Sequence, residues 1–164
     1  MLDGLRSLAC DGVEVASAGT WAMEGHPPTA EVFVTLSNHS IELSHSAHAV
    51  AVTRDHVAQA DLVVVMTSVQ SREIEDMIPS GPDKVRLIKE LPELEPPRGG
   101  SPQERLKALL RAARPEWRRD LDVNDPIGLP LAAYERAYGE LRPGIDRLLD
   151  VVCEGRAGTP AVSS

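Results

Sequence analysis

The sequence predicts an α/β domain built around a parallel sheet. A continuous apolar run, Asp61–Met66, is typical of a strand buried on both faces of a parallel sheet. Along the chain, strand-like runs alternate with segments of helical periodicity, which is the pattern of parallel α/β folds. The 164 residues, 42% of them hydrophobic, suffice for one domain with its own core.

Each expected element has a local signal. Apolar residues three to four positions apart mark helices, short apolar runs mark strands, and Gly, Pro and Asp mark the turns. In chain order we expect the end of a helix over 2–10, a strand over 13–16, helices over 30–39 and 55–59, a strand over 61–66, a helix over 69–78, a strand over 85–88, an exposed loop over 92–101, and helices over 102–113 and 130–152. The domain spans 1–152, and residues 153–164 are expected to form a flexible tail.

Two helices carry further detail. Thr29 stands where it can cap the helix over 30–39. The last helix has an apolar stripe that we expect to face the core, made of Leu131, Tyr134, Leu141, Ile145, Leu148, Leu149 and Val152.

Composition excludes several classes of function. A net charge of −8 argues against general binding to nucleic acid or to an anionic membrane, since both need a basic surface. No run of 18 apolar residues is present, so no membrane span is expected. The N-terminus has neither the basic start nor the apolar run of a signal peptide, so we expect a cytoplasmic protein.

Cysteine and histidine give no sign of a metal or cofactor. Cys10 and Cys153 match no zinc or Cys-x-x-Cys spacing, and each is expected to be a small apolar residue with a reduced thiol. His39, His45 and His48 suggest a metal site only weakly, because no further ligand spacing supports one. We expect exposed loop histidines, no metal and no cofactor.

The fold class itself predicts where a site lies. Ligands of parallel sheets bind at the carboxyl ends of the strands. Here those ends lead to residues 17–21, to 66–68, and to the loop that carries Asp122 and Asp125.

Three segments, taken in order, resemble the low-molecular-weight protein-tyrosine phosphatases. Val13–Thr20 is similar to their second strand and turn, Ala60–Met66 to their third strand, and Asp122–Gly128 to their general-acid loop. The resemblance implies a three-layer, doubly wound parallel sheet of the phosphotyrosine-phosphatase I-like fold. It also implies hydrolysis of phosphotyrosine in protein substrates through a cysteinyl-phosphate. Thioredoxin-coupled arsenate reductases share this fold.

The resemblance assigns roles to five residues. Asp125 matches the general acid, although Asp before Pro also starts turns. Asp122 matches a loop-orienting residue, and Ser17 a side chain that supports the catalytic loop or is only a small turn residue. Trp21 lies near the aromatic that walls the substrate ring; the alternative is a surface Trp packed on the domain. Ile127 replaces an aromatic that stacks on the substrate in many members, which argues against a preference for aryl phosphates.

The family's nucleophile motif does not occur in the sequence. The family uses a Cys, five residues, then an Arg, on a loop whose amides and guanidinium bind phosphate and favour the thiolate. The sixth residue after Cys10 is Ala16, and the sixth after Cys153 is Thr159. We therefore expect an N-terminally truncated, inactive chain that lacks the first strand and the catalytic loop.

Losing a buried strand costs on the order of 8–15 kcal/mol, comparable to a domain's net stability, so we also expect marginal stability. A pseudo-phosphatase with a binding or regulatory role is the alternative function. An arsenate reductase ranks last, because the two cysteines are poorly placed to shuttle a disulfide.

Overall fold

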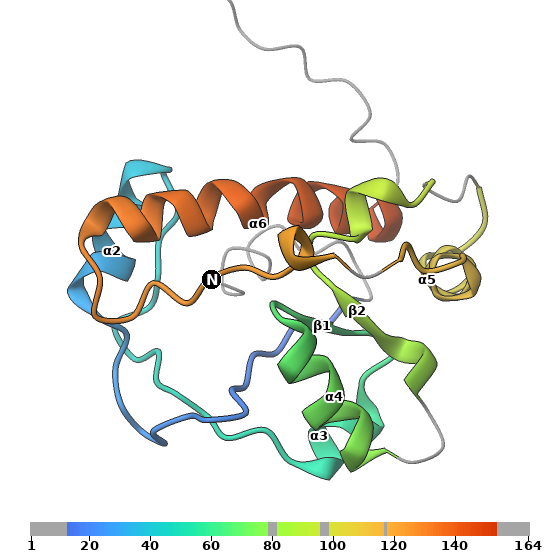
Figure 1. Ribbon diagram of the computed structural model, residues 1–164, viewed down its shortest axis with the longest axis horizontal. Helices are drawn as coiled ribbons and strands as arrows, with labels where there is room; N and C mark the ends of the chain where they lie inside the picture. Colours follow the sequence, from blue (N-terminus) through green and yellow to red (C-terminus); the bar gives the residue numbers. More distant parts are fainter. Residues whose placement is uncertain (1–12, 79–81, 96–98, 117, 154–164) are drawn as a thin grey trace, which may run out of the picture.

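Two parallel strands lie between layers of helices in the computed structural model (Figure 1), which describes residues 13–78, 82–95, 99–116 and 118–153. In chain order its helices and strands are α2 (Ala30–Asn38), α3 (Arg54–Gln59), β1 (Val63–Val65), α4 (Ser68–Met77), β2 (Val85–Leu87), α5 (Pro102–Arg111) and α6 (Leu131–Val152), with 3-10 turns η1 (Pro82–Lys84), η2 (Leu91–Glu93) and η3 (Arg119–Leu121). β1 pairs with β2 in parallel, with Val64 opposite Arg86.

The two faces of this sheet are covered by different helices. Because side chains alternate along a strand, Val65 and Leu87 point to one face and Val64 to the other. Val65 and Leu87 pack in a core cluster with Val57 of α3 and Ile74 of α4. Val64 packs against the second core cluster, which α5, α6 and η2 supply. The expected three-layer α/β arrangement is therefore confirmed.

α6 packs very closely on the end of β2. A Cβ atom placed on Gly144 would lie 2.3 Å from the carbonyl oxygen of Ile88, so only glycine fits this contact. The buried residues of the helix are Ala133, Tyr134, Ala137, Tyr138, Leu141, Gly144, Leu148, Leu149 and Val151.

The expected stripe of α6 is wrong at its first residue, because Leu131 is 37% exposed. At the other end Val152 is partly buried and packs against the core, beside the fully buried Val151. Leu129 is exposed as well. The first turn of α6 therefore extends beyond the edge of the core, which the periodicity alone does not indicate.

Most expected helices and strands are confirmed within one or two residues, and three local expectations are wrong. Residues 13–16 form no strand, and a parallel bridge a few residues further on joins Gly19 to Ala51. β1 covers three residues, of which only Val65 is buried, so it is not buried on both faces. The expected exposed loop over 92–101 contains part of η2 and the buried Leu94, because this segment packs under α6.

Thr29 occupies the N-cap position of α2, as expected, but its side chain does not cap the helix. The hydroxyl instead donates to the Tyr134 hydroxyl of α6, at 3.2 Å. This hydrogen bond joins α2 to α6, so Thr29 acts in packing rather than in helix initiation.

Cys153 departs from the expectation of a free thiol. Its side chain is buried beside Leu149, and its sulfur is disulfide-bonded. Cys10, the only other cysteine of the sequence, lies outside the described residues, as do the expected helix over 2–10 and residues 154–164 of the expected tail.

Within the described ranges, no helix combines the length and the hydrophobicity that a membrane crossing requires.

Candidate active site

The loop over 122–128 begins at the carboxyl end of β1. The backbone N–H of Val123 donates to the carbonyl oxygen of Met66, the residue that follows this strand, at 2.9 Å. The Val123 side chain is buried in the core cluster beneath α6. The loop therefore leaves from the edge of the sheet where parallel α/β proteins bind their ligands.

Asp122 fixes the start of this loop to α4. Its carboxylate accepts two hydrogen bonds from Ser68, one from the backbone N–H at 2.8 Å and one from the hydroxyl at 3.1 Å. Ser68 is the first residue of α4, so the carboxylate also meets the positive end of the helix dipole. The sequence predicts a site near residues 66–68 but not that Ser68 binds Asp122. A hydroxyl residue that begins a helix directly after a strand is the sequence feature that could have indicated this partner.

Lys89 holds the same segment from the other side. Its ammonium donates to a Glu140 carboxylate oxygen of α6 at 2.9 Å, and to the Asp122 carbonyl oxygen at a longer 3.5 Å. Lys89 comes two residues after β2, again at the carboxyl edge of the sheet. Its role is not predictable from the sequence, because one lysine after a strand has no distinctive spacing.

A pair of exposed carboxylates anchors the turn that leads into the loop. The Arg118 guanidinium donates to Glu93 at 2.6 Å and to Asp120 at 3.1 Å. Hydrogen bonds from Arg118 lower the pKa of both carboxyls and raise the pKa of the guanidinium. The fork joins η2 to η3 directly before Asp122.

Asp125 stands at the exposed tip of the loop. One carboxylate oxygen, Oδ1, accepts the N–H of Ile127 at 2.9 Å, and Leu129 N–H donates to Pro126 at 2.9 Å. The chain then turns through Gly128, whose φ of +74° favours glycine. The second oxygen, Oδ2, makes no hydrogen bond to any described residue and is open to a proton or a substrate.

Trp21 and Ser17 have no hydrogen bond to Asp125 within the described part of the chain, and Ile127 bonds to it through its backbone N–H and not its side chain. Trp21 is 86% exposed, and its indole N–H donates to Glu73 of α4 at 2.9 Å. The Ile127 side chain is 61% exposed at the loop tip. Ser17 is exposed and makes no hydrogen bond within the described part of the chain. Their assigned roles, and those of Asp122 and Asp125, stay predictions.

The histidines have structural contacts in separate places. His39 lies 2.9 Å from a Glu135 carboxylate oxygen and stacks on Tyr138, whereas His45 stacks on Phe33. Across the described ranges, no group of three or more His, Cys, Asp or Glu side chains has an arrangement that would hold a metal ion.

The fold is that of an α/β protein with a parallel sheet and a loop anchored at the carboxyl edge, where such proteins bind their ligands. A family model described as low molecular weight phosphotyrosine protein phosphatase matches residues 4–96, more than half of the chain, and the chain therefore belongs to this family. The resemblance drawn from three sequence segments is confirmed. The loop that carries Asp125 lies beyond the matched residues.

Curated relatives include two kinds of phosphatase. The chain is 28% identical over 146 residues to the probable low molecular weight protein-tyrosine-phosphatase EpsP of Ralstonia solanacearum, covering 89% of the chain and 81% of the relative. It is 29% identical over 139 residues to a protein-arginine-phosphatase of Geobacillus stearothermophilus, covering 85% of the chain and 76% of the relative.

Solved structures show the same fold. The YwlE arginine phosphatase from Geobacillus stearothermophilus aligns with a TM-score of 0.65 at 27% identity, covering 89% of this chain and 78% of that one. The low molecular weight protein tyrosine phosphatase from T. tengcongensis aligns with a TM-score of 0.62 at 29% identity, covering 84% and 76%. These alignments confirm the predicted fold class.

Proposed function

We propose that this protein is a phosphomonoester hydrolase of phosphotyrosine in proteins, in which Asp125 is the proton donor. The observation that carries the proposal is the anchoring of the Asp-Pro loop at the carboxyl edge of β1. Two hydrogen bonds from Ser68 hold Asp122, and Val123 bonds to Met66. Membership in the phosphatase family supports the same reaction class.

Asp125 is suited to both proton transfers of such a reaction. In the first step a cysteine thiolate takes the phosphoryl group, and the protonated Asp125 gives its proton to the departing oxygen. In the second step the carboxylate takes a proton from water, which attacks phosphorus and releases phosphate and the thiolate. The free Oδ2 of Asp125 is the oxygen available for this exchange, because Oδ1 is occupied by Ile127 N–H.

The nucleophile is the part that these 164 residues do not supply. No cysteine of the sequence is followed after five residues by an arginine, and Cys153 is buried in a disulfide. A phosphoryl group needs a thiolate and a planar guanidinium fork arranged together. We therefore propose that these residues alone do not turn over an aryl phosphate above background.

The test compares two proteins. One is the 164-residue chain; the other carries, joined ahead of residue 1, a first strand and Cys-x5-Arg loop typical of the family. With para-nitrophenyl phosphate, we expect no turnover by the first and measurable turnover by the second. In the second protein, Asp125→Asn should lower kcat by roughly 100-fold or more.

Asp150→Asn is the matched control, because Asp150 is an exposed carboxylate near the end of α6, away from the Asp125 loop. It should leave kcat within about twofold. An Asp125→Asn protein as fast as its parent would show that Asp125 is not the proton donor. Turnover by the 164-residue chain itself would contradict the proposed dependence on the added loop.

Phosphoarginine is a second candidate substrate. An arginine phosphatase of Geobacillus stearothermophilus is found both among the curated relatives and among the similar solved structures. In this chain Ile127, rather than an aromatic, follows Asp-Pro at the exposed loop tip, so nothing at this position favours stacking on a phenyl ring. The kcat/KM of the loop-bearing protein on phosphoarginine and phosphotyrosine peptides decides between the two substrates.

The cytoplasmic location and the absence of nucleic-acid binding stay predictions within this proposal. The net charge of −8 supports the second of them. Co-purification with nucleic acid at low salt would contradict it.

A further inference from the structure

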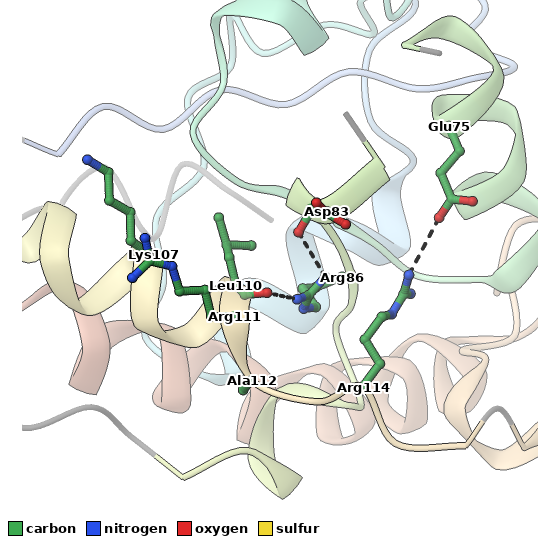
Figure 2. Close-up of a pocket in the computed structure, with 8 residues that line it drawn as sticks. All are labelled: Glu75, Asp83, Arg86, Lys107, Leu110, Arg111, Ala112 and Arg114. Atoms are coloured by element: carbon green, nitrogen blue, oxygen red, sulfur yellow. Dashed lines mark hydrogen bonds and ion pairs between the residues drawn. The ribbon is translucent and has the colours of Figure 1, made fainter. Parts of the chain in front are cut away.

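A cleft of the described chain lies away from the Asp125 loop. It has a volume of about 650 Å³ and is formed by α4, η1, β2, the end of α5 and the segment that follows α5 (Figure 2). Its lining residues are Glu75, Asp83, Arg86, Lys107, Leu110, Arg111, Ala112 and Arg114. Neither Asp122 nor Asp125 belongs to this lining, so the cleft is separate from the candidate active site.

The cleft is cationic in a protein that is strongly anionic. Four of its eight lining residues carry a positive charge and two a negative charge, whereas the whole sequence has a net charge of −8. Lys107 and Arg111 lie four residues apart on α5, where like charges repel. Figure 2 shows these two side chains on one side of the cleft, Arg86 at its centre and Arg114 on the other side.

Arg86 forms the wall of the cleft and is held rigidly. Arg86 is 2% exposed, and its guanidinium donates to the carbonyl oxygens of Asp83, Val85 and Leu110. Its Nε lies 3.4 Å from Glu90, without a hydrogen bond. Burial lowers the pKa of Arg86, Glu90 opposes this change, and the charge of Arg114 lowers the pKa further. The charge of Arg114 therefore acts on the buried guanidinium.

The other three cations of the cleft have N–H groups that can donate hydrogen bonds to a ligand. Arg114 lies 3.6 Å from both Glu75 and Glu90, which is longer than a hydrogen bond. The side chains of Lys107 and Arg111 are exposed and have no hydrogen bond or ion pair within the described ranges. Guanidinium and ammonium groups arranged around a cleft bind the oxygens of phosphates and carboxylates.

We propose that this cleft is a binding site for a multivalent oxyanion, held by Lys107, Arg111 and Arg114 against the buried Arg86. Only Leu110 and Ala112 of the eight lining residues are apolar in type, and the four cations favour a strongly charged ligand. A polyphosphate and a tricarboxylate both have this chemistry. The site is independent of the proposed hydrolase reaction.

The test is isothermal titration of the purified 164-residue chain with pyrophosphate, with citrate and with inorganic phosphate, at ionic strength held constant with NaCl. We expect saturable binding at a single site for pyrophosphate or citrate, and weaker binding of phosphate. The preferred titrant distinguishes a polyphosphate ligand from a polycarboxylate. Arg114→Gln should weaken binding about tenfold or more, since it removes charge-assisted hydrogen bonds.

Arg136→Gln is the matched control, because Arg136 is an exposed cation on α6 that does not line the cleft. It should leave the affinity unchanged. The double variant Lys107→Gln, Arg111→Gln alters only exposed positions of α5. If Arg114→Gln unfolds, the affinity of this double variant tests the proposal instead. Absence of saturable binding, wild-type affinity in the double variant, or an equal loss in Arg136→Gln would each overturn the proposal.

Discussion

Ser68 donates both its backbone N–H and its hydroxyl to the carboxylate of Asp122, 54 residues further along the chain. The pair joins the first turn of α4 to the segment that leads into the Asp-Pro loop. The partly buried carboxylate is compensated by two donors and by the positive end of the helix. The position of Asp125 therefore depends on α4 as well as on its own loop.

Replacing Ser68 with alanine should destabilise the protein through this pair. The hydroxyl bond is lost and the backbone bond remains, so we expect a decrease of about 1 kcal/mol in the free energy of unfolding. Asp122→Ala removes both acceptors and should cost more, about 1.5–3 kcal/mol. Urea unfolding measures both values. Ser37→Ala, at an exposed position of α2, is the control and should change stability by less than about 0.5 kcal/mol.

The sequence predicted the neighbourhood of this pair but not the pair itself. The run 61–66 and the turn residues at 122–128 are local signals, and both are found at the carboxyl edge of the sheet. The bond between Ser68 and Asp122 joins distant positions, and no local pattern encodes it. Lys89 was missed for the same reason, because its contact with Glu140 depends on how α6 crosses the sheet.

The errors at residues 13–16 and at Leu131 have a common physical origin. A strand forms only where a neighbouring strand lies beside it, and residues 13–16, despite their apolar pattern, are not part of the sheet that β1 and β2 form. A helical stripe is buried only where a core lies opposite it, and Leu131 precedes that core. Periodicity reports which side chains are suited to burial, whereas tertiary contacts decide which of them are buried.

Gly144 and Gly139 offer a matched pair within α6. Gly144→Ala would place a Cβ 2.3 Å from the carbonyl oxygen of Ile88, so the helix has to move away from β2. We expect a loss of about 1–3 kcal/mol from this overpacking. At Gly139 a Cβ meets nothing within 4 Å, and Gly139→Ala should stabilise the protein by up to about 1 kcal/mol through helix propensity. Thermal and urea unfolding of the two variants should differ in sign, and equal effects would contradict the close approach of α6 to β2.

Glu90 should make stability fall as the pH rises above the ordinary range of a carboxyl. Burial raises the pKa of Glu90, and the opposing charges of Arg114 and Arg86 compensate only in part. The folded state therefore keeps its proton at a pH where the unfolded chain, with a carboxyl pKa of about 4.3, has lost it. In that window the unfolded state binds fewer protons, and the free energy of unfolding decreases with increasing pH.

The measurement is the free energy of unfolding of the parent minus that of Glu90→Gln, followed from pH 4.5 upwards. Because glutamine does not titrate, this difference should decrease with increasing pH until Glu90 is ionised in both states. Glu42→Gln, at an exposed position without a described partner, is the control. A difference that rises with pH would show that the ion pair with Arg86 outweighs the cost of burial.

Replacing Trp21 distinguishes a role of this side chain in substrate binding from a role in stability. Its side chain is 86% exposed and its described hydrogen bond is to Glu73, so Trp21→Ala should change the free energy of unfolding by less than about 1 kcal/mol. In the protein that carries an added Cys-x5-Arg loop, the same variant should raise the KM for an aryl phosphate about tenfold and leave kcat within about threefold, because an aromatic wall binds substrate and transition state alike. Glu73→Gln keeps an acceptor for the indole and should retain most of the affinity. An unchanged KM together with a large loss of stability would show that Trp21 serves the fold and not the substrate.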